Sequence, residues 1–106
     1  NDVLAVKARE VLRATGYTHV QVRTSDGYLG WPENAPFNAI IVTCAPSRIP
    51  DALQAQLAEG GRMIIPVDVM MGQELILLTK VQGRLERKAV LPVRFVPMID
   101  SSGREY

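Results

Sequence analysis

The chain has 106 residues, of which 47% are hydrophobic and 22% are charged, and its formal net charge is +1. This length suits a single domain with one core. The near-zero net charge gives no electrostatic basis for binding nucleic acid or an anionic membrane. The single cysteine, Cys44, excludes an internal disulfide and suits a reducing compartment, so we expect a cytoplasmic protein.

The first two predicted elements are a helix and a strand. Residues 2–15 carry apolar side chains at the spacing of one helix face, namely Leu4, Ala8, Val11 and Leu12. Residues 19–23 alternate in polarity and predict a half-buried strand with Val20 and Val22 directed inward. The pair Asp26-Gly27 ends this strand in a turn.

The middle of the chain predicts further α/β structure. Residues 39–44 are a continuous apolar run, which is typical of a parallel strand covered on both faces. Pro50 suits the first turn of a helix that extends to about residue 58 and ends at Gly60-Gly61. Residues 62–67 predict a second buried strand that Pro66 stops. The alternation of helices and strands predicts a parallel sheet.

The last elements differ from this alternation. Residues 74–81 and 85–96 resemble two strands, and the two-residue connection Gln82-Gly83 predicts an antiparallel hairpin. We expect a domain over residues 1–98 and a polar C-terminal tail over residues 99–106. No apolar run approaches the ~20 residues of a membrane span, and no group of side chains has metal-ligand spacing.

Taken in order, these segments resemble the protein-L-isoaspartate O-methyltransferase family from about residue 4 to residue 98. The matching stretches are GYTHVQVRTSDGYLGW, APFNAIIVTCAPSRIPDALQAQLAEGGRMIIPV, GQELILLTK and LPVRFVPM. The resemblance implies an α/β fold, specifically the C-terminal half of a Rossmann-like S-adenosylmethionine-dependent methyltransferase sheet. Its strands would be parallel, followed by a terminal antiparallel hairpin. The family's other half, with its glycine-rich cofactor loop, has no counterpart here.

The resemblance implies a cofactor-binding role for Asp26 and Gly27. Asp26 would accept a hydrogen bond from the adenine amino group of S-adenosyl-L-methionine, and Gly27 would let the backbone approach the ring. A carboxylate at a strand end can bind an exocyclic amine in this way. The alternative interpretation is a plain turn. Trp31 and Phe37 are interpreted as aromatic side chains of the core or of the cleft wall.

The resemblance also implies a substrate-binding segment, made of Thr43, Cys44, Ala45 and Pro46. These residues would shape the pocket for the isoaspartyl residue, or they merely end a strand. Cys44 is interpreted as a small buried hydrophobe, because no histidine stands in a recognisable arrangement that would make it a nucleophile. No catalytic residue is assigned.

The family's reaction is methyl transfer from S-adenosylmethionine to the α-carboxylate of L-isoaspartyl residues in damaged proteins, which are repaired as a result. The partners implied are isoaspartyl-containing proteins or peptides. We expect this chain to be a C-terminal fragment that is inactive alone, which leaves its status as an enzyme open. One alternative is a non-enzymatic assembly module that self-associates through an exposed strand edge. Another is a related methyltransferase with a different carboxylate acceptor, for which departures from the family pattern at Asn38 and Asp68 leave room.

Overall fold

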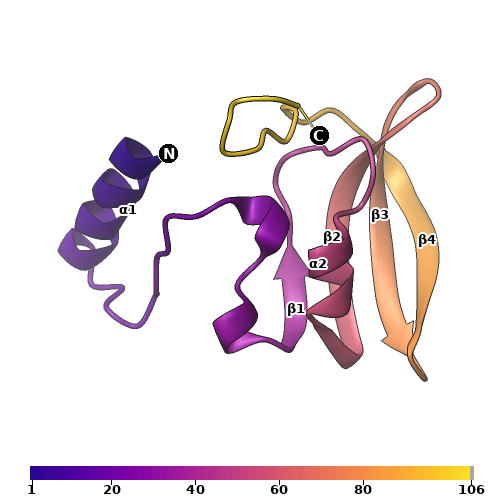
Figure 1. Ribbon diagram of the computed structural model, residues 1–106, viewed down its shortest axis with the longest axis horizontal. Helices are drawn as coiled ribbons and strands as arrows, with labels where there is room; N and C mark the ends of the chain where they lie inside the picture. The colour runs from indigo at the N-terminus through magenta and orange to yellow at the C-terminus, as the bar shows by residue number, and fades with distance from the viewer. Residues whose placement is uncertain (106) are drawn as a thin grey trace.

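The computed structural model describes residues 1–105, and Tyr106 of the predicted tail lies outside them. It contains a four-stranded sheet in the order β1-β2-β3-β4 (Figure 1). The strands are β1 (Phe37–Ile41), β2 (Leu57–Val69), β3 (Gly72–Val81) and β4 (Arg84–Val93). β1 and β2 are parallel, whereas the β2–β3 and β3–β4 pairs are antiparallel. The predicted combination of parallel strands with a terminal hairpin is therefore confirmed.

The β3–β4 hairpin turns at Gln82-Gly83, as predicted. Both residues have positive φ, 51° and 75°, which is the conformation of a two-residue type I′ turn. The Glu59 carboxylate accepts hydrogen bonds from the backbone N–H groups of both turn residues. A carboxylate on β2 therefore fixes the turn that joins the two following strands.

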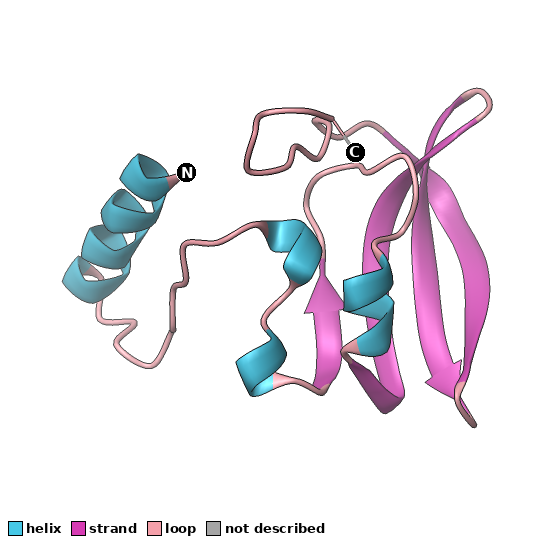
Figure 2. Ribbon diagram, in the orientation of Figure 1, coloured by secondary structure: helices cyan, strands magenta, loops and turns pink. Residues whose placement is uncertain are grey.

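α2 (Asp51–Ala55) lies against one face of the sheet (Figure 2), and the core is packed between the two. Because side chains alternate across a strand, every second residue of β2 and β3 is directed toward α2. The buried cluster consists of Leu53, Leu57, Met63, Ile65, Val67, Ile76 and Leu78. This cluster holds α2 against the sheet beside β1, where the candidate site lies.

The predicted boundary between α2 and β2 is wrong. The helix ends at Ala55, and Gly60-Gly61 lie inside β2 instead of ending a helix. An added Cβ on Gly61 would lie 2.8 Å from the Ala58 carbonyl oxygen. Glycine at position 61 therefore permits close backbone packing, at a point where the β1–β2 register is irregular.

The limits of the strands also differ from prediction, and β4 ends at Val93 instead of residue 96. β2 continues through Pro66 to Val69, because its pairing with β1 has already ended at Ile64. Proline is tolerated where one side of a strand has no neighbour. The strand expected over residues 39–44 is β1, which begins and ends earlier, at Phe37–Ile41. β1 forms a sheet edge, and Ile41 is 75% exposed, so the expected cover on both faces is not present.

The first 25 residues, called the N-terminal arm below, contain the predicted helix but not the predicted strand. Asn1 is the N-cap of α1 (Asp2–Ala14), and its Oδ1 accepts hydrogen bonds from the N–H groups of Val3 and Leu4. No residue of α1 is buried, and Figure 1 shows the helix standing apart from the sheet. Within residues 1–105, no helix has the length and apolar character that a membrane crossing requires.

His19 lies in a turn, and residues 20–23 form neither helix nor strand in the described chain. Val20, expected to be directed inward, is 43% exposed. An alternating pattern supplies one apolar face, but a strand also needs a neighbour for its backbone N–H and C=O groups. No named strand of residues 1–105 pairs with this segment, which is the physical reason that the prediction was wrong.

Candidate functional site

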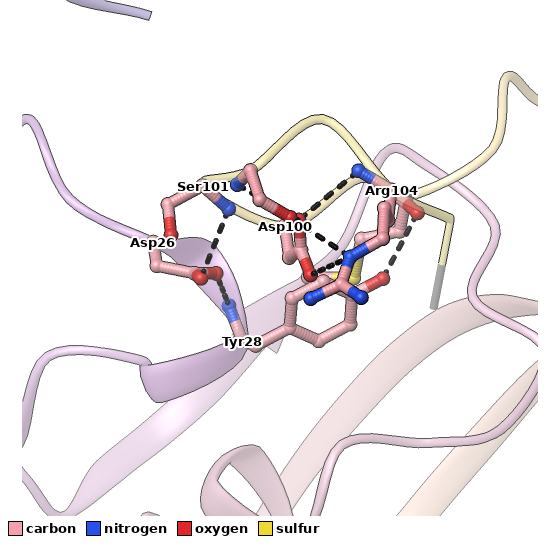
Figure 3. Close-up of polar contacts among 7 residues, drawn as sticks. Asp26, Tyr28, Asp100, Ser101 and Arg104 are labelled. Atoms are coloured by element: carbon pink, nitrogen blue, oxygen red, sulfur yellow. Dashed lines mark hydrogen bonds and ion pairs between the residues drawn. The ribbon is translucent and has the colours of Figure 1, made fainter.

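The candidate site is centred on Asp26, which begins the short helix η1 (Gly27–Leu29). Asp26 Oδ1 accepts a hydrogen bond from the Tyr28 N–H at 3.0 Å. Its Oδ2 accepts one from the Ser101 N–H at 3.2 Å (Figure 3). The interpretation of Asp26 as a turn residue is thus confirmed for part of its bonding capacity. A carboxylate offers about four acceptor positions, so it retains capacity for a further donor.

Asp26 and Gly27 line a pocket of about 340 Å³. Its walls come from the loop before β1, from β1 itself and from the α2 region: Arg23, Ser25, Gly30, Trp31, Phe37, Ala39, Ile40, Leu53 and Gln56. Trp31 and Phe37 were expected in the core or in the cleft wall, and both line this pocket. A concave site with mostly apolar walls and a few polar groups is typical of small-molecule binding.

Gln56, which was not among the predicted site residues, fixes one wall of this pocket. Its Oε1 accepts a hydrogen bond from the Trp31 N–H at 2.9 Å, and its Nε2 donates to the Leu29 carbonyl at 2.9 Å. Its backbone carbonyl accepts from the Phe37 N–H at 2.7 Å. These side-chain partners lie 25 and 27 residues away in the chain. No local sequence pattern could have indicated them.

Gly30 allows Gln56 to approach the loop so closely. Gly30 has a φ of 64°, and an added Cβ would lie 2.1 Å from Gln56 Oε1. Any side chain at position 30 would meet both backbone strain and a steric clash. The loop wall of the pocket therefore depends on glycine at this position.

Arg23 forms the outer rim of the pocket. Its guanidinium bonds the Glu33 carboxylate at 2.7 Å and lies 5.7 Å from the centroid of the Trp31 ring. The Glu33 side chain is 65% exposed, so the ion pair is exposed to solvent screening. The combined contacts hold the end of the N-terminal arm against the pocket.

The predicted substrate segment, residues 43–46, follows β1 and does not line this pocket among the described residues. Thr43 is exposed and Cys44 is half-buried, whereas Ala45 and Pro46 are buried. Partial burial raises the pKa of the Cys44 thiol above its usual value, which opposes nucleophilic reactivity. The burial of Ala45 and Pro46 supports the alternative in which they serve packing at the end of the strand.

Met98 connects the two predicted site segments. Its N–H donates to the Ala45 carbonyl at 3.0 Å, and its carbonyl accepts from the Tyr28 hydroxyl at 2.9 Å. The Ala45 N–H donates in turn to the Val96 carbonyl at 2.7 Å. The turn at Asp26 and the segment after β1 are therefore both attached to the same C-terminal stretch of chain.

The mixed sheet with its pocket at the β1 edge matches part of the fold of solved S-adenosylmethionine-dependent methyltransferases. A solved protein-L-isoaspartate O-methyltransferase superposes with a TM-score of 0.83 and 30% identity, covering 91% of this chain and 31% of the other. A second, from Plasmodium falciparum in complex with S-adenosyl-L-homocysteine, has a TM-score of 0.60 and 34% identity. It covers 63% of this chain and 30% of that one.

The sequence profile of the family protein-L-isoaspartate(D-aspartate) O-methyltransferase matches residues 1–103. The chain belongs to this family. A protein-L-isoaspartate O-methyltransferase of Gloeobacter violaceus is 45% identical over 97% of this chain and 51% of the relative. A second, from a Polaromonas species, is 50% identical over 92% of this chain and 47% of the relative. The chain thus spans about half the length of the curated relatives that it matches.

Proposed function

We propose that this chain forms the adenine-binding part of a methyltransferase that transfers a methyl group from S-adenosyl-L-methionine to the α-carboxylate of L-isoaspartyl residues. The observation that carries the proposal is the Asp26 carboxylate, which lines a mostly apolar pocket and still has acceptor capacity. Membership of the family supports the reaction class. Isoaspartyl-containing proteins or peptides are the proposed partners, and a cytoplasmic location stays a prediction from the single Cys44.

The residues present fit an adenine ring. Apolar side chains offer faces for the ring, and a carboxylate acceptor suits its exocyclic amino group. Gly27 has no neighbour closer to an added Cβ than the Met98 methyl group at 3.6 Å. Its lack of a side chain therefore leaves room for a ring against the backbone. When bound, the cofactor supplies the methyl group, while Asp26 and Gly27 bind and orient its base.

We also propose that residues 43–46 contribute to the substrate side. Thr43 is the exposed member of this segment, so its hydroxyl is the group available to a peptide. Ala45 and Pro46 would act by holding the backbone, through the bonds of Ala45 to the C-terminal segment. The role of Cys44 would be to fill space.

A fusion protein tests the proposed reaction. It joins the half of the Gloeobacter violaceus relative that this chain does not match to the present chain. We expect it to methylate an isoaspartyl peptide and to leave the aspartyl peptide of the same sequence unmodified. A panel of other carboxylates tests the alternative acceptor. Methylation of another acceptor but not of the isoaspartyl peptide would refute the proposed substrate.

Substitution of Asp26 tests the adenine contact within this fusion. Asp26→Ala removes a charged acceptor, and we expect the Kd of S-adenosylhomocysteine to rise about 10- to 100-fold. Glu86→Ala, which changes an exposed carboxylate on β4, is the matched control and leaves the Kd unchanged. An unchanged Kd in Asp26→Ala, measured by titration calorimetry, contradicts the contact.

We propose further that the chain alone is inactive, because one adenine contact leaves most of the cofactor unbound. Titration of the isolated chain with S-adenosylhomocysteine tests this point. A Kd below about 10 μM, or −7 kcal/mol, would refute it.

The exposed edge of β1 supports a second candidate function, self-association of the chain. Among residues 1–105, β1 pairs with one strand only, and Ile41 at its end is 75% exposed. An apolar edge strand with unpaired backbone groups is a template for pairing with another strand. We expect dimers or larger species of the isolated chain by light scattering, on the order of tens of micromolar. A monodisperse monomer at that concentration contradicts this candidate.

A further inference from the structure

The C-terminal segment contains a turn, residues 100–104, in which one carboxylate accepts three hydrogen bonds. Asp100 Oδ1 accepts hydrogen bonds from the Ser102 N–H at 2.8 Å, the Ser102 hydroxyl at 2.6 Å and the Arg104 N–H at 3.0 Å. The Asp100 N–H donates to the Arg104 carbonyl at 2.8 Å, and the Gly103 N–H donates to the Asp100 carbonyl at 3.0 Å. The turn thus has its own internal bonding and a defined shape.

This turn is attached to the candidate site at two points. Ser101 is a residue of the turn, and its N–H donates to Asp26 Oδ2 at 3.2 Å. Shortly before the turn, the backbone carbonyl of the buried Met98 accepts a hydrogen bond from the Tyr28 hydroxyl at 2.9 Å. Figure 3 shows Asp100 and Arg104 on one side of Ser101 and Asp26 on the other. The turn therefore bridges from the end of the chain to the pocket wall, across 75 residues of sequence.

The second bond to Asp26 has a specific geometric effect. The terminal torsion of an aspartate is broad, so a carboxylate held through one oxygen can rotate. Held through Oδ1 by Tyr28 and through Oδ2 by Ser101, the carboxylate plane of Asp26 is fixed. Its remaining acceptor positions then have fixed directions at the pocket.

We propose that Asp100 is a positioning residue for ligand recognition at Asp26. By accepting three hydrogen bonds within the turn, its side chain holds the Ser101 N–H on Asp26 Oδ2 and so directs the Asp26 carboxylate toward the exocyclic amino group of the bound base. Asp100 does not line the pocket itself. The inference rests on the proposed adenine contact, and it adds a residue that acts through another.

The experiment compares two probes in the fusion protein described above. One is S-adenosylhomocysteine, and the other is the same compound with hydrogen in place of the 6-amino group. The measured quantity is the ratio of their Kd values, by titration calorimetry. We expect the unsubstituted fusion to prefer the amino compound about 10-fold or more, because a bond to a charged acceptor is strong.

Two variants test Asp100. Asp100→Ala removes the three hydrogen bonds that the side chain accepts within the turn. We expect the preference for the amino compound to fall about 5-fold or more as the Asp26 carboxylate loses its orientation. Asp100→Asn retains a side-chain oxygen that can accept the same bonds, so it keeps most of the preference. Glu86→Ala on β4 is the control and leaves the ratio unchanged. Each ratio comes from one preparation, so a loss of folded protein cancels.

The outcomes separate the two claims. If the unsubstituted fusion binds both probes equally, the adenine contact at Asp26 fails and the role of Asp100 fails with it. If that fusion discriminates and Asp100→Ala discriminates equally, the positioning role alone is overturned. An equal loss of affinity for both probes in Asp100→Ala means that the turn is only structural, which also overturns the inference.

Discussion

The N-terminal arm and the rest of the chain differ sharply in burial, although both contain well-formed elements. No residue among the first 25 is buried, and the apolar Leu4 and Val11 of α1 are 63% and 51% exposed. In the sheet, by contrast, Met63 and Ile65 have no exposed surface. The comparison shows that a cap and a periodic pattern define a helix, whereas burial requires a second surface.

The largest expected effect on stability comes from removing apolar volume in the core, compared with the same kind of change in the N-terminal arm. Ile65→Ala opens a cavity in the core and should lower the free energy of unfolding by about 2–5 kcal/mol. Leu4→Ala removes a side chain that is already exposed, so its effect should stay within about 0.5 kcal/mol. Urea unfolding of the chain measures both. Similar losses would break the contrast between the two regions.

Repeating Leu4→Ala in the fusion protein sharpens the same comparison. If the added half covers the apolar face of α1, the substitution becomes destabilising there by about 1 kcal/mol or more. An effect as small as in the isolated chain means that this face stays exposed in both.

A smaller effect is expected from Gly30→Ala, because backbone strain of this kind costs about 1–3 kcal/mol. The substitution also displaces Gln56 from the pocket wall, since the new Cβ would lie 2.1 Å from its Oε1. Gly16→Ala is the matched control in the N-terminal arm, with a φ of 89° and no atom within 4 Å of an added Cβ. We expect a smaller loss at position 16 by urea unfolding. Equal losses would mean that strain alone, and not the contact with Gln56, decides the cost.

Arg23→Ala tests the attachment of the arm, and its stability effect should be small. An exposed ion pair contributes up to about 1 kcal/mol, and the contact with Trp31 adds about 0.5–1 kcal/mol. The more sensitive measurement is backbone NMR relaxation, in which residues 17–25 should become more mobile. Arg13→Ala in α1 should leave their relaxation unchanged. Unaltered mobility in Arg23→Ala would show that other contacts hold the arm.

The smallest expected effect is the pH dependence of the C-terminal turn. Hydrogen bonds from the Ser102 side chain and from the backbone of Arg104 and Ser102 lower the pKa of Asp100 below its usual 3.8. The stabilisation is therefore complete above the unfolded-state pKa and is lost as pH falls through the lower folded-state pKa. Amide exchange of Ser102 and Arg104 should accelerate, relative to the intrinsic rate, only below that unfolded-state value. Loss of protection at neutral pH would contradict this assignment.

Short-range features of the fold could be predicted from the sequence, and features with distant partners could not. The hairpin at Gln82-Gly83 was predicted correctly, because the turn residues and both strands are neighbours in the chain. The strand expected over residues 19–23 failed, because an alternating pattern does not specify a partner. The helix end predicted at Gly60-Gly61 is wrong, since the sequence does not distinguish glycine in a helix cap from glycine in an irregular strand.

The candidate site shows the same limit. The resemblance implies a binding role for Asp26 and Gly27, and both residues line a pocket. Gln56 and Ser101 were missed, because each acts through a bond to a residue far away in the chain. Their side-chain and backbone groups become informative only when the fold brings them to the loop.

The pairing of β1 with β2 is irregular close to the end of α2. Phe37 pairs with Leu57, but Ala39 already pairs with Arg62, so residues 58–61 stand opposite residue 38. Because the side chains of a strand alternate between its faces, the number of residues at this point decides which later residues of β2 face α2. A chain with one residue fewer here would turn Arg62 toward α2 and Met63 away from it.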